Sequence, residues 1–115
     1  MGFKAIHYKQ ISSNEVKEVG AEGVLVRWLI NKENDSAENF AMRLFEIVPG
    51  GHTPEHSHDW EHEVYVLEGD GIVFCDGSEK QLRSGYVVFV PPNAVHYFRN
   101  IGKGTLRFLC LIPYI

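Results

Sequence analysis

Short apolar or alternating runs recur roughly every ten residues along most of this chain, and turn-forming residues separate them. The runs are rich in β-branched and aromatic residues, and no segment with the apolar spacing of a helix lies between them. Strands are therefore expected at residues 23–30, 40–48, 62–68, 71–75, 86–90, 94–99 and 105–112. The pattern predicts an all-β fold, either an antiparallel barrel or a sandwich.

Glycine, proline, asparagine and aspartate mark the expected turns between these strands. They gather at residues 49–51, 69–71, 76–78, 84–85, 91–93 and 102–104. The Asp76-Gly77 pair fits a hairpin turn, because glycine accepts a positive φ. Residues 31–39 are polar and rich in charge, which predicts a solvated loop.

Length and charge exclude several classes of protein. The chain has 115 residues, which suits one domain over residues 1–115, and its net charge of −4 argues against a nucleic-acid partner. No apolar run reaches the ~20 residues needed to cross a bilayer, so no membrane association is expected. The first residues lack the apolar core of an export signal, so Cys75 and Cys110 are expected to be free thiols in the cytoplasm.

Histidines are concentrated in one short stretch of the chain. Six are present, and His52, His56, His58 and His62 fall within eleven residues. The spacing of His56 and His58 puts both side chains on one face of a strand. Three imidazoles on one inward face would be costly to bury without a partner, and a divalent metal ion supplies one. His56, His58 and His62 are therefore predicted to bind a metal ion, whereas His52 and the isolated His7 are expected at the surface.

Two segments resemble the motifs of the cupin superfamily. The segment from Gly50 to Gly69 reads G-x5-H-x-H-x3-H-x6-G, and the first cupin motif is G-x5-H-x-H-x3-4-E-x6-G. The segment from Gly85 to Asn100 reads G-x5-P-x-N-x2-H-x3-N, and the second motif is G-x5-P-x-G-x2-H-x3-N. The resemblance implies a single cupin domain, which is a jelly-roll β-barrel or double-stranded β-helix with a metal ion in its mouth. It also adds His96 to the metal ligands.

The chain departs from these motifs at two positions. Asn93 replaces a glycine, and the turn is expected to be kept because Asn also tolerates a positive φ. His62 stands at the glutamate position when counted back from Gly69, whereas counting forward from His58 would select Glu63. Strand alternation favours His62 as the ligand, because Glu63 would then face away from the cavity.

An all-histidine set narrows the resemblance to the small single-domain tetra-histidine manganese cupins. Residues 42–45, 56–63 and 108–113 are similar to those proteins. This resemblance implies a homodimer and one divalent metal ion per chain, with manganese favoured and with open positions for other ligands. Iron, nickel, zinc and copper are the alternatives, since affinity alone favours copper, nickel or zinc over manganese. Four neutral ligands would leave the charge of the ion uncompensated and make it a strong Lewis acid.

Aromatic and thiol side chains are candidates for the walls of a pocket beside the metal. Phe98 shares the face of His96 by strand alternation. The resemblance places Phe108 and Cys110 in the cavity, although Cys110 fits a small buried apolar residue equally well. Trp60 is expected at the cavity mouth, with the core or a dimer interface as the alternatives.

Two of the expected strands carry a single arginine within a mainly apolar run. Arg43, in the strand at 40–48, fits a side chain that binds a substrate carboxylate, and it fits equally a side chain on the outer face. The strand at 23–30 is apolar on both faces except for Arg27. Its second face is therefore expected to meet a partner subunit or the N-terminal segment.

The function predicted from these residues is that of a metal-dependent oxidoreductase of dioxygenase type, acting on a small molecule that the sequence does not identify. Open positions on a redox-capable metal would bind the substrate and O₂ side by side. One alternative is a cupin that only binds a metal or a small ligand, and another is a Lewis-acid isomerase. No His, Glu or Asp outside the metal ligands stands out as a general base, which weakens the isomerase alternative.

Overall fold

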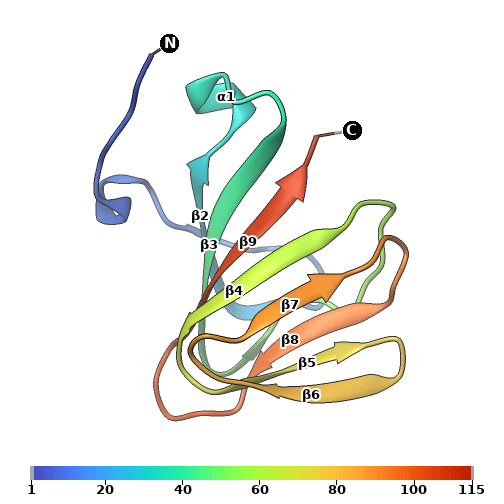
Figure 1. The fold of residues 1–115 in the computed structure, drawn as a ribbon. Coiled ribbons are helices and arrows are strands. Elements are labelled where there is room, and N and C mark those ends of the chain that lie inside the picture. The colour runs from blue at the N-terminus through green and yellow to red at the C-terminus, as the bar shows by residue number, and fades with distance from the viewer. Residues whose placement is uncertain (1, 115) are drawn as a thin grey trace.

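Antiparallel strands dominate the computed structural model, which describes residues 2–114 (Figure 1). The strands are β1 (Asn14–Glu15), β2 (Glu22–Ile30), β3 (Phe40–His52), β4 (His62–Glu68), β5 (Gly71–Cys75), β6 (Ser78–Leu82), β7 (Val87–Val90), β8 (His96–Asn100) and β9 (Leu106–Pro113). They form one curled sheet in the order β6-β5-β8-β3-β9-β4-β7, and β2 pairs with β3 and with β1. The prediction of an all-β antiparallel barrel is confirmed.

The two halves of the barrel are joined by β3, which is longer than expected. The predicted strand stopped before a turn at residues 49–51, but the observed strand continues through these residues to His52. Gly50 has φ +80°, and a Cβ on Gly51 would lie 2.6 Å from the Glu22 carbonyl oxygen, so the two glycines permit a bend that larger residues would block. The predicted turn is therefore a bend within β3, after which His52 pairs with β8 instead of β9.

Two further elements differ from the sequence-based expectation. β6 was not expected, because four of its five side chains are exposed and polar. Its pairing with β5 comes from the predicted hairpin turn, in which Asp76 and Gly77 have φ of 46° and 83°. The loop expected at residues 31–39 contains the one-turn helix α1 (Lys32–Asp35), because Asn31 Oδ1 accepts a hydrogen bond from the Asn34 amide at 2.8 Å.

Alternation along the strands decides which side chains fill the barrel. On β4, His62, Val64 and Val66 are buried, whereas Glu63 and Tyr65 are exposed. Valine, isoleucine, leucine and phenylalanine side chains from the other strands complete the core. Its buried members are Val24, Ile47, Val64, Val66, Val73, Leu82, Val90, Ala94, Phe98, Leu106, Phe108 and Cys110. The inward faces of the strands are thus mainly apolar, with the histidines, Arg43 and the buried Asn100 as polar exceptions.

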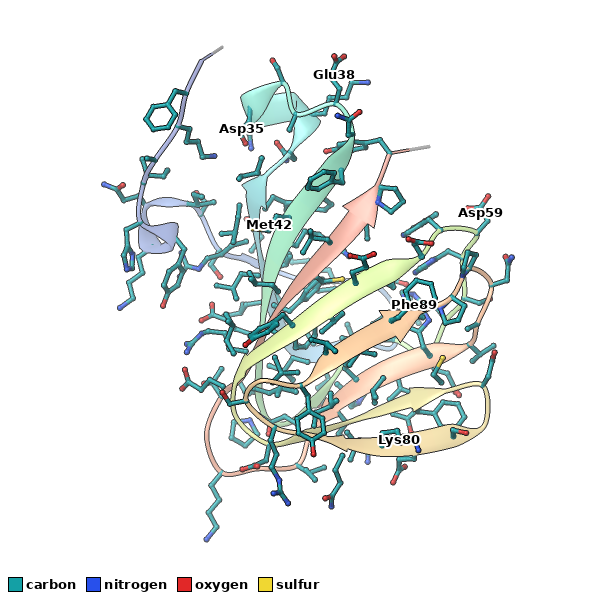
Figure 2. The ribbon with its side chains drawn as sticks, in the orientation of Figure 1. Asp35, Glu38, Met42, Asp59, Lys80 and Phe89 are labelled. Carbon is teal, nitrogen blue, oxygen red and sulfur yellow. The ribbon has the colours of Figure 1, made fainter. Side chains whose placement is uncertain are left out.

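The N-terminal segment lies against β2, as one of the two sequence-based alternatives proposed. The Lys4 Nζ donates a hydrogen bond to the Leu29 carbonyl at 2.8 Å and pairs with Asp35 at 2.7 Å, and Arg27 donates to the Ile11 carbonyl. Figure 2 shows Asp35 at the end of the molecule that carries α1, and Asp59 in the loop that leads into β4. None of the helices among residues 2–114 is long and apolar enough to cross a membrane.

Candidate metal centre

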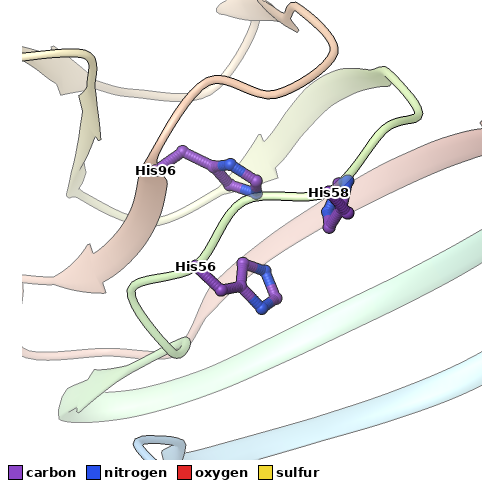
Figure 3. Close-up of side chains that lie close together, drawn as sticks. All are labelled: His56, His58 and His96. Carbon is purple, nitrogen blue, oxygen red and sulfur yellow. The ribbon is translucent and has the colours of Figure 1, made fainter.

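Four histidine rings face one another on the inner side of the barrel. His56 and His58 lie in the segment between β3 and β4, His62 begins β4, and His96 begins β8 (Figure 3 shows three of them). The ring centres of His56, His58 and His96 are 5.0–5.1 Å apart, and potential ligand atoms of these three residues lie within 4.8 Å of one another. The His62 ring centre is 4.6 Å from that of His58 and 5.1 Å from that of His96.

Backbone hydrogen bonds hold the histidine segments together. His56 and His96 form an isolated antiparallel bridge, with N···O distances of 3.2 and 3.0 Å. Asn93 has φ 68°, as expected for the residue that replaces a motif glycine, and its amide donates to the His58 carbonyl at 2.6 Å. The turn before β8 therefore fixes the approach of both His58 and His96 to the cluster.

Three of the four rings have a hydrogen-bond acceptor at Nδ1. The acceptors are the Glu18 carboxylate for His56 (2.9 Å), the Trp60 carbonyl for His58 (3.0 Å) and the Ala94 carbonyl for His96 (2.9 Å). An acceptor at Nδ1 keeps the proton on that nitrogen and leaves the lone pair of Nε2 free. This is the tautomer that a metal-binding imidazole needs.

His62 has a different surrounding. Its Nδ1 lies 3.2 Å from the Sγ of Cys110 and 3.3 Å from the Nη2 of Arg43, and Arg43 donates to the same sulfur at 3.1 Å. If the sulfur accepts from both groups, His62 keeps its Nδ1 proton and a free Nε2 lone pair, which metal binding requires; if Nδ1 instead accepts from Arg43, the proton lies on Nε2. Glu63 is exposed on the opposite face of β4, as strand alternation predicted.

Burial favours the neutral form of three of these imidazoles. Burial and, secondarily, the positive charge of Arg43 together lower the pKa of His62 to about 3. Burial also lowers the pKa of His58 and of His96. His58, His62 and His96 are therefore unprotonated at neutral pH, which is the state in which an imidazole can bind a metal ion.

The donor set fits a divalent metal ion. Two nitrogens bound at right angles to one ion at about 2.1 Å lie about 3.0 Å apart. The Nε2 atoms of His58 and His62 are 2.9 Å apart, which matches this spacing without a change in the fold. Neutral imidazole suits manganese, iron, nickel, copper and zinc alike, so the cluster could hold a metal ion but does not select one.

A cavity of about 440 Å³ opens beside the cluster. All five pocket candidates from the sequence line it, namely Arg43, Trp60, Phe98, Phe108 and Cys110. The Trp60 ring stacks on His58 with centres 4.1 Å apart and planes 5° from parallel, and Phe98 stacks on Phe108 at 4.8 Å. The sequence left open whether the Arg43 side chain points into the cavity or lies on the outer face of its strand. The structure places it in the cavity.

The sequence reasoning missed several residues of this site. Glu18 lies in the segment between β1 and β2, and its contact with His56 spans 38 positions, which no local pattern predicts. Trp28 and Phe45 also line the cavity, and the alternation of β2 and β3 could have indicated both. His52 is not among the lining residues, and its Nε2 lies 3.7 Å from Glu22 instead.

Comparison with known proteins supports the motif-based resemblance. A family model for the cupin domain matches residues 43–112. The chain is 32% identical over 88 residues to the oxalate-binding protein of Thermotoga maritima, which covers 73% of this chain and 70% of that protein. It is 29% identical over 86 residues to the quercetin 2,3-dioxygenase of Bacillus subtilis, which covers 74% of this chain and 26% of that protein.

A solved structure with the same fold is the polyketide cyclase RemF of Streptomyces resistomycificus. The TM-score is 0.90 at 35% sequence identity, and the match covers 97% of this chain and 80% of that chain. The chain spans about half the length of other curated relatives that it matches, 53% in one case and 46% in another. The match to the family model, residues 43–112, covers both motifs and the strands that carry the histidines.

Proposed function

This chain belongs to the cupin family, and on that premise we propose that it binds one divalent metal ion through His56, His58, His62 and His96. The observation that carries the proposal is the convergence of four imidazoles, three of which have a hydrogen-bond acceptor at Nδ1. Burying such a cluster without a shared partner would be costly, and a metal ion supplies that partner.

Manganese is the proposed metal, with iron, nickel, zinc and copper as the alternatives. When bound, a manganese or iron ion would supply Lewis acidity and one-electron redox chemistry to an oxygen-donor ligand. Four imidazole ligands carry no negative charge, so they would leave the 2+ charge of the ion uncompensated. The site therefore favours anionic ligands over cationic ones. Glu18 is the one carboxylate among the described lining residues, and it stands behind His56 at its Nδ1.

The reaction class that we propose is a dioxygenase-type oxidation of a small molecule. The cavity walls beside the histidines are mainly apolar and include five tryptophan or phenylalanine rings, so they would hold a flat substrate against the histidine cluster and exclude water from it. A relative of this chain is named a quercetin 2,3-dioxygenase, which favours this class. Another is named an oxalate-binding protein, which favours the second candidate, a cupin that binds a ligand without transforming it.

Metal content tests the proposed metal centre. The protein is purified without added metal or chelator, and its metals are counted by mass spectrometry and examined by electron paramagnetic resonance. We expect about one ion per chain in the wild type and a sharp loss in His62→Ala. The matched control is His52→Ala, which removes a histidine outside the cavity and should keep the ion. A wild type that binds no metal even after reconstitution would contradict the proposal.

Oxygen uptake then separates the two candidate functions. Metal-loaded protein is mixed with aromatic acids and phenols, and O₂ consumption is followed with an electrode alongside product analysis. Oxidised product with uptake of O₂ supports the dioxygenase. Tight binding of a ligand that is recovered unchanged supports the binding protein.

A further inference from the structure

Arg43 places a positive charge inside the apolar cavity without a negative partner. Among the described residues that line the cavity, it is the one lysine or arginine. No carboxylate of residues 2–114 lies within ion-pair distance of its guanidinium. A partly buried cation in such a place lacks the anion that usually accompanies it.

The other partly buried arginines of the sheet are paired. Arg27 lies 3.5 Å from the Glu46 carboxylate, and Arg107 lies 2.8 Å from it and also contacts Glu68. These two side chains stand on the outer surface of the strands, where the protein supplies their counter-charges. The missing counter-charge at Arg43 is therefore particular to the cavity.

The immediate neighbours of Arg43 are neutral. Its guanidinium carbon lies 5.4 Å from the Trp28 ring centre and 4.9 Å from the Phe45 ring centre. Its Nη2 contacts the Cys110 sulfur and the His62 imidazole, and its Nε is buried with no hydrogen-bond partner among the described residues. Aromatic faces and a thiol hold the cation in position but do not neutralise it.

The cavity walls add a preference for a flat molecule. Trp28, Phe45, Phe98 and Phe108 present aromatic surface around the space, whose volume of about 440 Å³ suits a ligand with one or two rings. The Glu18 carboxylate also lines the cavity, but its hydrogen bond goes to His56 at 2.9 Å, and it forms no ion pair with Arg43.

We propose that this cavity binds a flat aromatic or conjugated carboxylic acid as its anion, with the carboxylate directed to the Arg43 guanidinium. This inference deepens the proposed function, since it names the class of ligand for the same cavity. The guanidinium offers planar N–H donors to the carboxylate, while the rings stack on the body of the acid. The carboxylate of the ligand would thus supply the negative partner that the Arg43 guanidinium lacks in the protein.

Binding of three acids and their amides tests the proposal. Benzoate, salicylate and cinnamate are compared with benzamide, salicylamide and cinnamamide, which have similar shapes and no charge. Binding is followed by calorimetry and by quenching of tryptophan fluorescence, because Trp28 and Trp60 line the cavity. Each measurement is made on metal-loaded and on metal-depleted protein, so that a failure to bind metal does not prevent the test.

The variants are Arg43→Met and Arg43→Lys, with Arg99→Met on the exposed face of β8 as the matched control. We expect at least one acid to bind at least about tenfold more tightly than its amide, and Arg43→Met to remove this preference in metal-depleted protein, where no metal ion can attract the carboxylate. Arg43→Lys should keep part of the preference, and Arg99→Met all of it.

Thermal unfolding separates ligand binding from a structural role of Arg43. Because the cation is unpaired, Arg43→Met should unfold at the wild-type temperature or above it. The proposal would be overturned if metal-depleted Arg43→Met kept the preference for acids, or if none of the three acids bound at millimolar concentration. A large fall in the unfolding temperature of Arg43→Met would assign the side chain to the stability of the fold instead.

Discussion

Acidification of the metal-free protein should destabilise it through His62. The pKa of this imidazole is about 3 in the folded chain because of its burial and, secondarily, of Arg43, against an ordinary value of 6.5. Between these values the unfolded chain binds a proton at His62 that the folded chain does not bind. The stability that depends on a neutral His62 is therefore complete above pH 6.5 and is lost progressively as the pH falls towards 3.

The size of the effect follows from the same two values. At pH 5 the unfolded imidazole is about 1.5 units below its pKa of 6.5, and each unit is worth about 1.4 kcal/mol, so the loss is about 2 kcal/mol. For a domain of this length that corresponds to a fall in Tm of roughly 6–12 °C. His58 and His96 change in the same direction, so the wild type should lose more than this in total.

The assay is urea unfolding of chelator-treated protein at pH 7 and pH 5. His62→Gln removes the titration but keeps a polar side chain of similar length, so it should lose about 2 kcal/mol less than the wild type between the two pH values. His7→Gln, an exposed histidine, should behave as the wild type does. Equal pH dependence in His62→Gln and in the wild type would refute the argument from burial.

Three other changes should have measurable effects. Glu18→Gln should weaken manganese binding by about tenfold or more in a metal titration, because His56 loses a charged acceptor at Nδ1. The control Glu22→Gln should bind manganese as the wild type does. Equal affinities of Glu18→Gln and the wild type would contradict the role of Glu18 as the acceptor of His56. Gly51→Ala should lower the free energy of unfolding in urea by about 1–3 kcal/mol, because its Cβ would meet the Glu22 carbonyl oxygen. Gly104→Ala is the control, because a Cβ at that position has no neighbour within 4 Å. An unchanged free energy of unfolding in Gly51→Ala would argue against the bend in β3. Light scattering should give twice the chain mass of 13.1 kDa, and Phe89→Ser on the exposed apolar face of β7 should favour the monomer. A monomeric wild type would contradict the homodimer that the resemblance implies.

Local patterns in the sequence were sufficient for the parts of the site that depend on a single strand. Alternation along β4 and the motif distance to Gly69 placed His62 inward and Glu63 outward, and both placements are observed. The tolerance of Asn93 for a positive φ likewise predicted the turn before β8. Each inference needed only the geometry of neighbouring residues, which the chain order determines directly.

The features that were missed depend on contacts between distant segments. β6 is polar and becomes a strand because the preceding hairpin aligns it with β5, so composition gives no sign of it. Residues 49–51 have turn composition, yet β3 continues through them because its two ends pair with different strands. Glu18 and His56 meet only after the barrel closes, and for Arg43 the sequence left open two faces that only the closed barrel distinguishes.

The most direct test of the four-histidine centre is a crystal structure of the manganese-loaded protein with anomalous scattering. We expect one anomalous peak per chain within about 2.0–2.4 Å of the Nε2 atoms of His56, His58, His62 and His96. A peak bound by only three of these histidines, with His62 still held between Cys110 and Arg43, would contradict the fourth ligand. A peak elsewhere, or none, would contradict the metal centre itself.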